Sequence, residues 1–512
     1  MAAVGSAGPS GFEGPSGAAE NRQLLMAALR TDGQPPLDAD VVVAGGGNAA
    51  LCAAIEASLR GARVLLLERA PEYLRGGNSR HTRNIRYLHD ERTAYVTGPY
   101  PREEFLDDLL RVGGSATNTP FAETTIEESR RVPEWMARQG VRWQQPLRGT
   151  LHLSRTNLFF LGGGKALVNT YYDRVLRLGV RVCYNAAVTG VEDRGGAGCA
   201  ALAEIAGVRR TIPCRALIAA AGGFEANIGW LARYWGEAAR RFLIRGTPYN
   251  DGTLLAAMLE RGAQPVGDPK GFHALAIDAR SPQFDGGIVT RVDSLPFGIV
   301  VNREGRRFYD EGEDIWPKRY AIWGGLVAAQ PDQTAYSVFD AKAWGRFIPP
   351  AYPPYRAETI PALAAQLDLN RDQFLATVED FNRGAPGVRR IDMSRLDGSA
   401  TSGVAPPKTN WASRLDTPPF FAFPVRPGIT FTYLGVTVDA RTRVLTASGA
   451  AMPHVYAAGE CMSGNILLRG YLGGFGLTIG TVSGRIAGRE AAAHAMGRDA
   501  GAAAGAVDRV RA

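Results

Sequence analysis

A glycine-rich segment near the start of the chain has the spacing of a dinucleotide site. It reads Gly45-x-Gly47-x-x-Ala50, and Glu68 follows about twenty residues later. Gly45 permits a tight turn, Gly47 lets a pyrophosphate approach the backbone, and Ala50 keeps the following helix close to its sheet. The Glu68 carboxylate can accept hydrogen bonds from ribose hydroxyls. The segment therefore predicts a dinucleotide, and it does not by itself distinguish NAD from FAD.

Four further segments resemble the fumarate reductase and succinate dehydrogenase flavoprotein family. They are 75–80 (RGGNSR), 220–227 (AAGGFEAN), 301–308 (VNREGRRF) and 457–460 (AAGE). The resemblance runs from about residue 38 to residue 488 and implies FAD, with the Gly-Gly-Asn-Ser loop on the pyrophosphate and flavin edge and the Gly-Glu pair at the ribityl chain and flavin. The residues expected to hold FAD are Gly45, Gly47, Asn48, Ala49, Ala50, Glu68, Arg69, Asn78, Ser79, Val188, Gly222, Gly459, Glu460, Gly476 and Leu477.

Three segments resemble one branch of that family, the tricarballylate dehydrogenases. They are 80–84 (RHTRN), 427–435 (PGITFTYLG) and 469–476 (RGYLGGFG). The resemblance implies desaturation of a polycarboxylate, tricarballylate to cis-aconitate, by α-proton abstraction and hydride transfer to flavin N5. Such a reaction develops enolate-like negative charge, which arginine stabilises well because its fork grips a carboxylate bidentately. The substrate is thus expected to be an anionic di- or tricarboxylate.

The residue types at these positions supply candidate catalytic groups. Arg80 and other arginines are candidates for binding carboxylates, and a histidine in Gly-Phe-His-Ala matches the family's substrate-binding histidine, with a core histidine as the alternative. Two tyrosines could orient substrate or shuttle a proton, or could simply pack. One further arginine, in Trp-Pro-Lys-Arg-Tyr, lies near the family's proton-donating arginine. The predicted catalytic set is His273, Arg319, Arg469, Tyr471, Tyr433 and Arg83.

The chain also departs from the family pattern. Thr430 and Phe431 stand where fumarate reductases carry a His-rich segment, and Tyr471 stands where they place a substrate-clamping arginine. The alternatives are a fumarate reductase-like or ketosteroid dehydrogenase-like enzyme on another substrate, or a flavoprotein retained as a binding subunit. The family's flavin-linking histidine aligns near Asn78, with His81 close by, so covalent and non-covalent flavin both stay open.

Hydrophobic patterns indicate how the chain positions these groups. Residues 39–44 form a short apolar run typical of a buried strand, a helix follows and stops at Gly61, and 63–68 (RVLLLE) predicts the next strand. Residues 181–218 predict an inserted antiparallel layer. Near the other end, 454–460 predicts another buried strand and 476–494 a Gly/Ala-rich helix.

These elements predict an α/β protein with a Rossmann-like FAD-binding domain that an α+β capping domain interrupts in sequence. Aromatic residues and prolines with short, mixed periodicity mark the interruption. The predicted parts are a disordered N-terminal tail (1–37), the first part of the FAD-binding domain (38–268), the substrate capping domain (269–433), the second part of the FAD-binding domain (434–498) and a disordered C-terminal tail (499–512).

Composition narrows the function further. The 512 residues carry a net charge of +8. The basic residues are scattered singly and form no Lys/Arg-rich run, a pattern that favours an anionic small molecule as ligand and disfavours nucleic acid. Five cysteines without a CxxC spacing disfavour a disulfide scaffold, a metal site and an iron-sulfur cluster, so electrons are expected to pass to a separate acceptor protein, membrane-bound by the resemblance. Without a predicted export signal or membrane span, we expect a cytoplasmic enzyme, or one held at the inner membrane through its redox partner.

Overall fold

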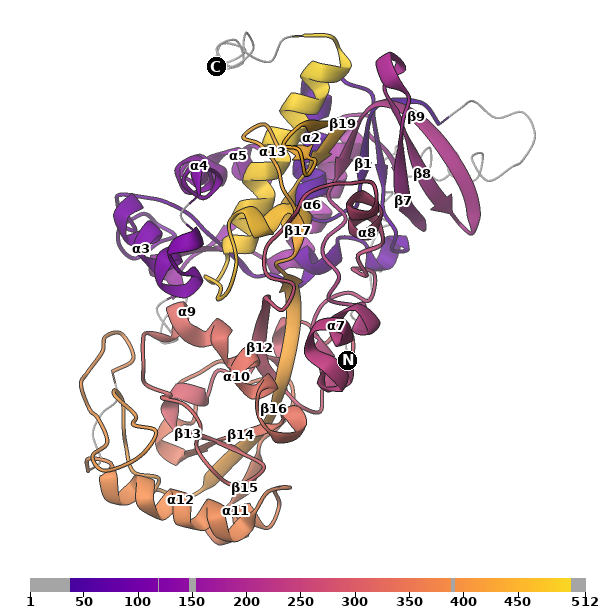
Figure 1. The fold of residues 1–512 in the computed structure, drawn as a ribbon. Helices are drawn as coiled ribbons and strands as arrows, with labels where there is room; N and C mark the ends of the chain where they lie inside the picture. Colours follow the sequence, from indigo (N-terminus) through magenta and orange to yellow (C-terminus); the bar gives the residue numbers. More distant parts are fainter. Residues whose placement is uncertain (1–36, 118, 147–152, 388–391, 499–512) are drawn as a thin grey trace, which may run out of the picture.

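The computed structural model describes residues 37–117, 119–146, 153–387 and 392–498. Apart from residue 37, the two predicted tails lie outside the described residues. Figure 1 shows an upper part, which contains both β1 and α13 from opposite ends of the chain, and a lower part built from the middle of the sequence. Among the described helices, none has both the length and the apolar character needed to cross a membrane.

A largely parallel sheet forms the centre of the upper part. Its order is β18-β19-β9-β1-β2-β6, and all neighbours on this path are parallel except β18 and β19. Strand β1 is buried along nearly its whole length, as an apolar strand between covering layers must be. The strands are β1 (Ala39–Ala44), β2 (Val64–Leu67), β6 (Arg181–Cys183), β9 (Val208–Ala219), β18 (Arg443–Leu445) and β19 (Ala451–Ala457).

Three helices pack together beside this sheet (Figure 1). α13 lies very close to α2 because glycines recur along the contacting side of α13. A Cβ atom added at Gly484 would lie 2.4 Å from the carbonyl oxygen of Ala49, and one at Gly488 would lie 2.3 Å from that of Ala53. The end of the chain thereby completes the layer that its start begins. The helices are α2 (Asn48–Leu59), α6 (Gly163–Arg177) and α13 (Phe475–Ala495).

Strand β9 changes partners along its length. From Val208 to Cys214 it is antiparallel to β8, and from Cys214 onward it runs parallel to β1. β8 also pairs with β7, so the predicted antiparallel layer is confirmed for residues 186–214, whereas the two ends of the predicted range, 181–183 and 215–218, are parallel strands of the main sheet. The two added strands are β7 (Ala186–Asp193) and β8 (Cys199–Ile205).

A second, mostly antiparallel sheet forms the lower part. Its order is β10-β16-β14-β13, with β12 and β15 also paired to β16. β10 precedes residue 269, the predicted start of the capping domain, and the division into domains stays a prediction. The strands are β10 (Leu243–Ile244), β12 (Phe272–Asp278), β13 (Ile299–Asn302), β14 (Ala335–Asp340), β15 (Tyr355–Ala357) and β16 (Phe420–Thr432). The helices are α9 (Trp316–Arg319), α10 (Trp323–Ala328), α11 (Ile360–Ala364) and α12 (Arg371–Gly384).

The 13-residue strand β16 connects the lower sheet to the upper part (Figure 1). Its first half pairs with β14 and its second half with β12. At its end, the Thr432 hydroxyl accepts a hydrogen bond from the Phe224 amide at 3.2 Å. The strand therefore brings its last residues to the junction of the two parts.

The remaining elements complete the edges of the upper part. The α/β class, with a dinucleotide-binding part assembled from both ends of the chain and an α+β cap, is confirmed. The helices are α3 (Arg102–Gly113), α4 (Pro120–Ser129), α5 (Val132–Arg138), α7 (Ile228–Trp235) and α8 (Thr253–Glu260), and the small-sheet strands are β3 (Asn84–Arg86), β4 (Trp143–Gln144), β5 (Asn157–Phe160), β11 (Pro265–Val266) and β17 (Gly435–Val436).

Candidate active site

The turn from β1 into α2 lines a cavity that segments of both parts enclose. Gly45 has a φ of +111°, which side chains rarely allow, and a Cβ atom there would lie 2.3 Å from the carbonyl oxygen of Ala220. Gly47 precedes α2, whose first amides have no partner within the helix. The motif thus presents a helix N-terminus to the cavity, an arrangement that binds phosphate.

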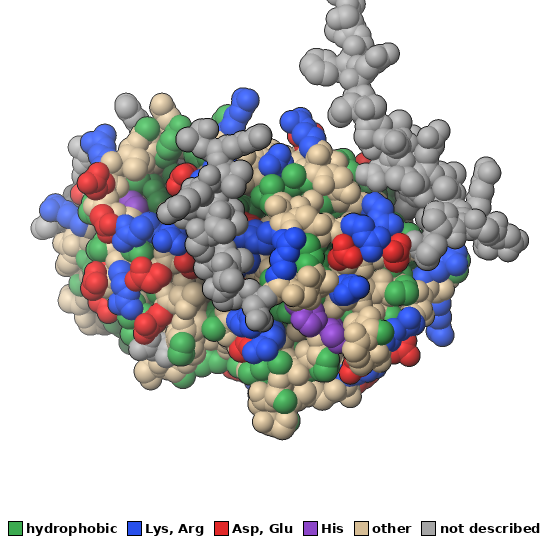
Figure 2. Space-filling model, turned by 90° about the horizontal axis from the view of Figure 1, so that it is seen from above, with side chains coloured by type: hydrophobic (Ala, Val, Ile, Leu, Met, Phe, Trp, Pro, Cys, Tyr) green, Lys and Arg blue, Asp and Glu red, His purple; other side chains and the backbone are tan. Residues whose placement is uncertain are grey.

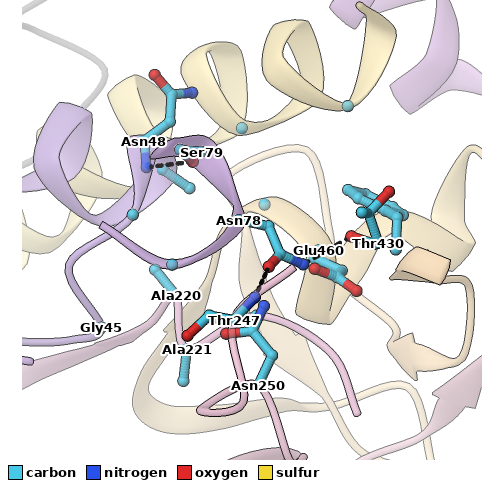
Figure 3. Close-up of a pocket in the computed structure, with 18 of the residues that line it drawn as sticks. Gly45, Asn48, Asn78, Ser79, Ala220, Ala221, Thr247, Asn250, Thr430 and Glu460 are labelled. Atoms are coloured by element: carbon cyan, nitrogen blue, oxygen red, sulfur yellow. Dashed lines mark hydrogen bonds between the residues drawn. The ribbon is translucent and has the colours of Figure 1, made fainter. Parts of the chain in front are cut away.

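Asn48 joins three distant segments at this turn. Its backbone amide donates to the Ser79 hydroxyl at 2.9 Å, and its side chain donates to the Leu477 carbonyl at 3.2 Å and to the Thr481 hydroxyl at 2.9 Å. Figure 3 shows the bond from Asn48 to Ser79. The 3₁₀ helix at Gly77–His81 is therefore held across the start of α2.

Asn78, in the same loop, contacts the lower part. Its side-chain oxygen accepts from the Thr247 amide at 2.8 Å, and its side-chain nitrogen donates to the Thr430 carbonyl at 2.7 Å and to Glu225 (Figure 3). The side-chain nitrogen of Asn78 thus fixes the loop against β16, and its side-chain oxygen fixes it against the segment that follows β10. The phosphate loop and the cap strand meet at this residue.

Glu68 follows β2 and lines the cavity. Its two carboxylate oxygens accept from the amides of Ala70 at 2.9 Å and Gly76 at 3.2 Å, and burial raises its pKa. A carboxylate oxygen accepts more than one hydrogen bond, so these contacts leave capacity for a ribose hydroxyl. The neighbouring Arg69 is paired with Asp251 at the same cavity.

Two buried carboxyl groups lie beside Asn78. Glu460 accepts from the Thr432 amide at 2.8 Å, and Glu225 accepts from the Asn250 side chain at 2.8 Å. Burial, followed by the neighbouring Glu225, raises the pKa of Glu460 well above its usual range. Burial also raises the pKa of Glu225. Burial and mutual repulsion therefore both oppose ionisation of this pair.

These residues fit the FAD that the sequence motifs predict. A phosphate-binding helix N-terminus, a carboxylate at the end of the second strand and a backbone-rich loop line the same cavity. Amide, hydroxyl and carboxyl groups continue from that loop towards β16. The cavity can thus hold an extended molecule with a charged centre and polar groups on either side.

Two buried arginines, Arg245 and Arg291, and the partly buried Arg83 line the same cavity. Arg245 donates through Nη2 to the Thr430 hydroxyl at 3.2 Å, and Arg291 donates through Nη2 to Asp293 at 2.7 Å. Arg83 approaches the same Asp293 carboxylate at 4.0 Å. Five of their nitrogens are buried without a hydrogen-bond partner in the described chain: Nε and Nη2 of Arg83, Nε and Nη1 of Arg245, and Nε of Arg291.

This cluster carries excess positive charge. Among the described residues, Asp293 is the one carboxylate that an ion pair joins to the three arginines. Burial, followed by the charge of Arg291, lowers the pKa values of both Arg83 and Arg245 to about 10. On the face shown in Figure 2, by contrast, acidic and basic side chains are interspersed. A buried cluster of unpaired cations is costly unless an anion binds to it.

His273 and two tyrosines complete this end of the cavity. The His273 ring stacks on Tyr471 with centroids 3.8 Å apart, and its Nδ1 lies 3.1 Å from the Thr430 hydroxyl. Burial and the neighbouring arginines lower its pKa well below 6.5, and its buried Nε2 has no partner in the described chain. The Arg291 guanidinium lies over the Tyr320 ring at 4.9 Å. A neutral imidazole and a phenol therefore adjoin the cationic cluster.

The structure brings most of the predicted site residues together. Ala50 is completely buried in α2, where its expected role was helix packing. The predicted residues that line the cavity are Gly45, Gly47, Asn48, Ala49, Glu68, Arg69, Asn78, Ser79, Arg83, Val188, Gly222, His273, Gly459, Glu460, Tyr471, Gly476 and Leu477. Their contacts with bound molecules remain proposals.

Three predicted catalytic residues do not line the cavity. Arg319 forms two hydrogen bonds to Glu313, at 2.6 and 2.7 Å, so its charge is already paired. Arg469 has an exposed side chain that lies against the Gly114 backbone. The Tyr433 hydroxyl donates to a backbone carbonyl. The structure therefore gives these three side chains positions outside the cluster.

Sequence reasoning missed Arg245, Arg291 and Tyr320. Arg245 directly follows the buried apolar run 242–244 (FLI), and an arginine beside buried apolar residues is a usable signal, whereas Arg291 follows no such run. Tyr320 directly follows the predicted Arg319. Their meeting depends on the pairing of the lower sheet, which short sequence patterns do not specify.

Comparison with known proteins agrees with this geometry. The model of the family described as FAD binding domain matches residues 40–476. The chain is 26% identical to the NADH:fumarate oxidoreductase of Klebsiella pneumoniae over 84% of this chain, which spans 45% of that protein's length. It is 24% identical to the fumarate reductase (cytochrome) of Shewanella frigidimarina over 87% of this chain and 75% of that protein.

Two solved structures share the fold. The open conformation of a flavocytochrome c3 fumarate reductase superposes with a TM-score of 0.67 and 20% identity, over 95% of this chain and 82% of that one. A 3-ketosteroid-Δ4-(5α)-dehydrogenase from Rhodococcus jostii RHA1 superposes with a TM-score of 0.69 and 22% identity, over 91% and 99%. The glycine turn and the cavity agree with the family match, which covers most of the chain and shows that this chain belongs to the FAD binding domain family, with FAD as its cofactor.

Proposed function

We propose that the enzyme desaturates a small polycarboxylate, with tricarballylate as the leading candidate and cis-aconitate as its product. The observation that carries this proposal is the cluster of Arg83, Arg245 and Arg291, whose five unpartnered nitrogens lie buried beside one shared carboxylate. A substrate with two or three carboxylates supplies the missing negative charge. A neutral substrate would leave the guanidinium groups unpaired.

The arginines would serve both binding and chemistry. Each guanidinium can grip a carboxylate through two parallel hydrogen bonds, which fixes the orientation of the substrate. When the α-proton leaves, negative charge spreads onto that carboxylate, and the fixed cations stabilise it more strongly than they stabilise the starting acid. Bound FAD supplies the two-electron acceptor.

Tyr320 is our candidate for the proton acceptor. It lines the cavity, and its hydroxyl has no hydrogen bond among the described residues, whereas the Tyr471 hydroxyl accepts from the Gly476 amide at 2.8 Å. The Arg291 guanidinium lies 4.9 Å from the centroid of its ring, so this phenol adjoins the arginine cluster where a substrate carboxylate would bind. His273, held neutral by burial, is suited to orient substrate through Nε2 rather than to take the proton.

The proposal keeps oxidation as the working direction and a separate protein as the electron acceptor. The three segments that resemble tricarballylate dehydrogenases support the direction and the substrate. Both curated relatives named above act on fumarate by name, and fumarate is a dicarboxylate. The five cysteines lack the spacing of an iron-sulfur ligand set, which supports an acceptor outside this chain.

The charge of the cluster gives the test. We expect Arg245→Met to slow anaerobic flavin reduction by tricarballylate at least about 100-fold, because the variant loses transition-state stabilisation. Arg240→Met changes an exposed arginine paired with Glu237 and serves as the control, with flavin reduction near the wild-type rate. Equal rates in both variants, with FAD bound in each, would remove the cluster from the reaction.

A further inference from the structure

Two of the five cysteines face each other across neighbouring strands. Cys199 begins β8 and Cys214 lies in β9, and the register of the two strands makes them direct partners. Their sulfur atoms are 3.4 Å apart. A disulfide needs about 2.05 Å, so a shift of little more than 1 Å, within the reach of side-chain rotation, would join them.

The pair lies close to the surface although both side chains are buried. Cys199 directly follows the turn at 194–198, whose residues up to Ala197 are exposed, and the exposed Arg215 follows Cys214. Exposed residues thus flank the pair in sequence on both strands. The other three cysteines lie in α2, in β6 and after β19. None of them forms a contact with a second cysteine sulfur among the described residues.

We propose that Cys199 and Cys214 form a two-electron redox site, which a peroxide converts into an intrachain disulfide between β8 and β9. The inference is independent of the proposed substrate. It rests on the register of β8 and β9 and on the two free thiols of Cys199 and Cys214. Disulfides that form in reducing compartments are typically transient and redox-sensing, which suits a reversible site.

The chemistry balances with peroxide as the oxidant. The sulfur of one cysteine attacks one peroxide oxygen and the O–O bond breaks, which gives a sulfenic acid and, with the thiol proton, one water. The sulfur of the second cysteine then attacks the sulfur of the sulfenic acid, the S–O bond breaks, and the second thiol proton leaves with the hydroxide as a second water. Two thiols lose two electrons and hydrogen peroxide gains them.

The geometry allows either thiol to take the first step, because either sulfur atom can donate the hydrogen bond that joins them. The thiolate is the reactive form, so the thiol that ionises is the nucleophile and its partner resolves the sulfenic acid.

The pair also ties together strands that reach the FAD cavity. β7, the partner of β8, contributes Ala186 and Val188 to the cavity, and Ala220 and Gly222 follow the end of β9. A disulfide would fix β8 to the residue at which β9 passes from the antiparallel layer into the parallel sheet. Oxidation would thereby restrain both walls of this end of the cavity.

The test uses the full-length holoenzyme treated with a small excess of hydrogen peroxide, then unfolded and labelled with N-ethylmaleimide. We expect the number of labelled thiols to fall from five to three, with one peptide pair joined through Cys199 and Cys214, and dithiothreitol to restore five. Cys183→Ser, which removes a similarly buried thiol on β6, should still form the disulfide.

Two outcomes would overturn the proposal. One is five labelled thiols after peroxide treatment that oxidises a small dithiol in the same tube. The other is a disulfide mapped to any other pair. Cys214→Ser should lose the disulfide, and because the wild-type peptide map decides the question alone, poor folding of this variant would not remove the test.

Discussion

Three guanidinium groups with too few carboxylates set the chemistry of this cavity. Arg291 is paired with Asp293, Arg83 only approaches it, and Arg245 contacts a hydroxyl. Proteins rarely bury such groups unpaired, so the cluster indicates an anionic ligand.

Sequence and structure make different predictions for Arg469. The sequence places it in the catalytic set, whereas the structure leaves its side chain exposed and outside the cavity lining. We therefore expect Arg469→Met to keep turnover within about twofold of wild type, as for most surface changes. Arg291→Met, which removes a cavity cation, should reduce kcat severely. Steady-state kinetics with tricarballylate checks both, and a larger loss for Arg469→Met would favour the sequence-based assignment.

His273 makes stability depend on pH in a defined direction. Its pKa in the folded protein lies well below 6.5, whereas in the unfolded chain it titrates near 6.5. The unfolded state binds more protons between these values, so the free energy of unfolding should fall as pH drops below about 6.5. From pH 6.5 to 5.5 this one group contributes about 1 kcal/mol.

Urea unfolding of the holoenzyme at pH 7.5 and 5.5 measures this effect. The His273→Gln variant should lose less stability than the wild type over the same interval. An equal loss in both proteins would show that His273 does not stay neutral in the folded state.

Short sequence motifs identified most of the cavity-lining residues that we expect to hold FAD. Gly45, Asn78 and Glu460 belong to short segments whose chemistry depends on backbone shape, and each segment carries its own signal. Arg245 and Arg291 were missed because they meet only after β10 and β12 pair with β16. Long-range pairing, and not residue type, decides that part of the site.

Helices and strands, like the site residues, could be predicted where a local pattern specifies them and not where they depend on long-range pairing. The sequence predicts β1 at its observed bounds and α2 and β2 within a residue or two, because each has one clear period. The length and four partners of β16 could not be predicted, since its proline-containing sequence has no single period.

The turn between β1 and α2 offers a matched pair of glycine substitutions. Gly45 and Gly61 both have positive φ, but a Cβ atom at Gly45 would clash with Ala220, whereas nothing lies within 4 Å of one at Gly61. Gly45→Ala should therefore yield protein largely without FAD. Gly61→Ala should carry only the roughly 1 kcal/mol cost of its backbone conformation and keep its flavin. The ratio of flavin to protein absorbance decides, and full FAD content in Gly45→Ala would contradict the tight turn.

At the scale of the whole molecule, the site exists only where the two parts meet. The upper part supplies the helix N-terminus and the Asn78 loop, and the lower part supplies Arg245, His273 and Arg291. Thr430, in β16, contacts both parts: its carbonyl accepts a hydrogen bond from Asn78 and its hydroxyl accepts one from Arg245. A ligand that contacts the arginine cluster therefore bridges the two parts.

We propose that this enzyme oxidises a polycarboxylate because of its charge. The most direct test is an anaerobic titration of the oxidised holoenzyme with tricarballylate and, in parallel, with its uncharged trimethyl ester. We expect the acid to bleach the flavin absorbance with cis-aconitate as product, and the ester to leave the absorbance unchanged. Bleaching by the ester as fast as by the acid, or no bleaching by any di- or tricarboxylate, would contradict the proposal.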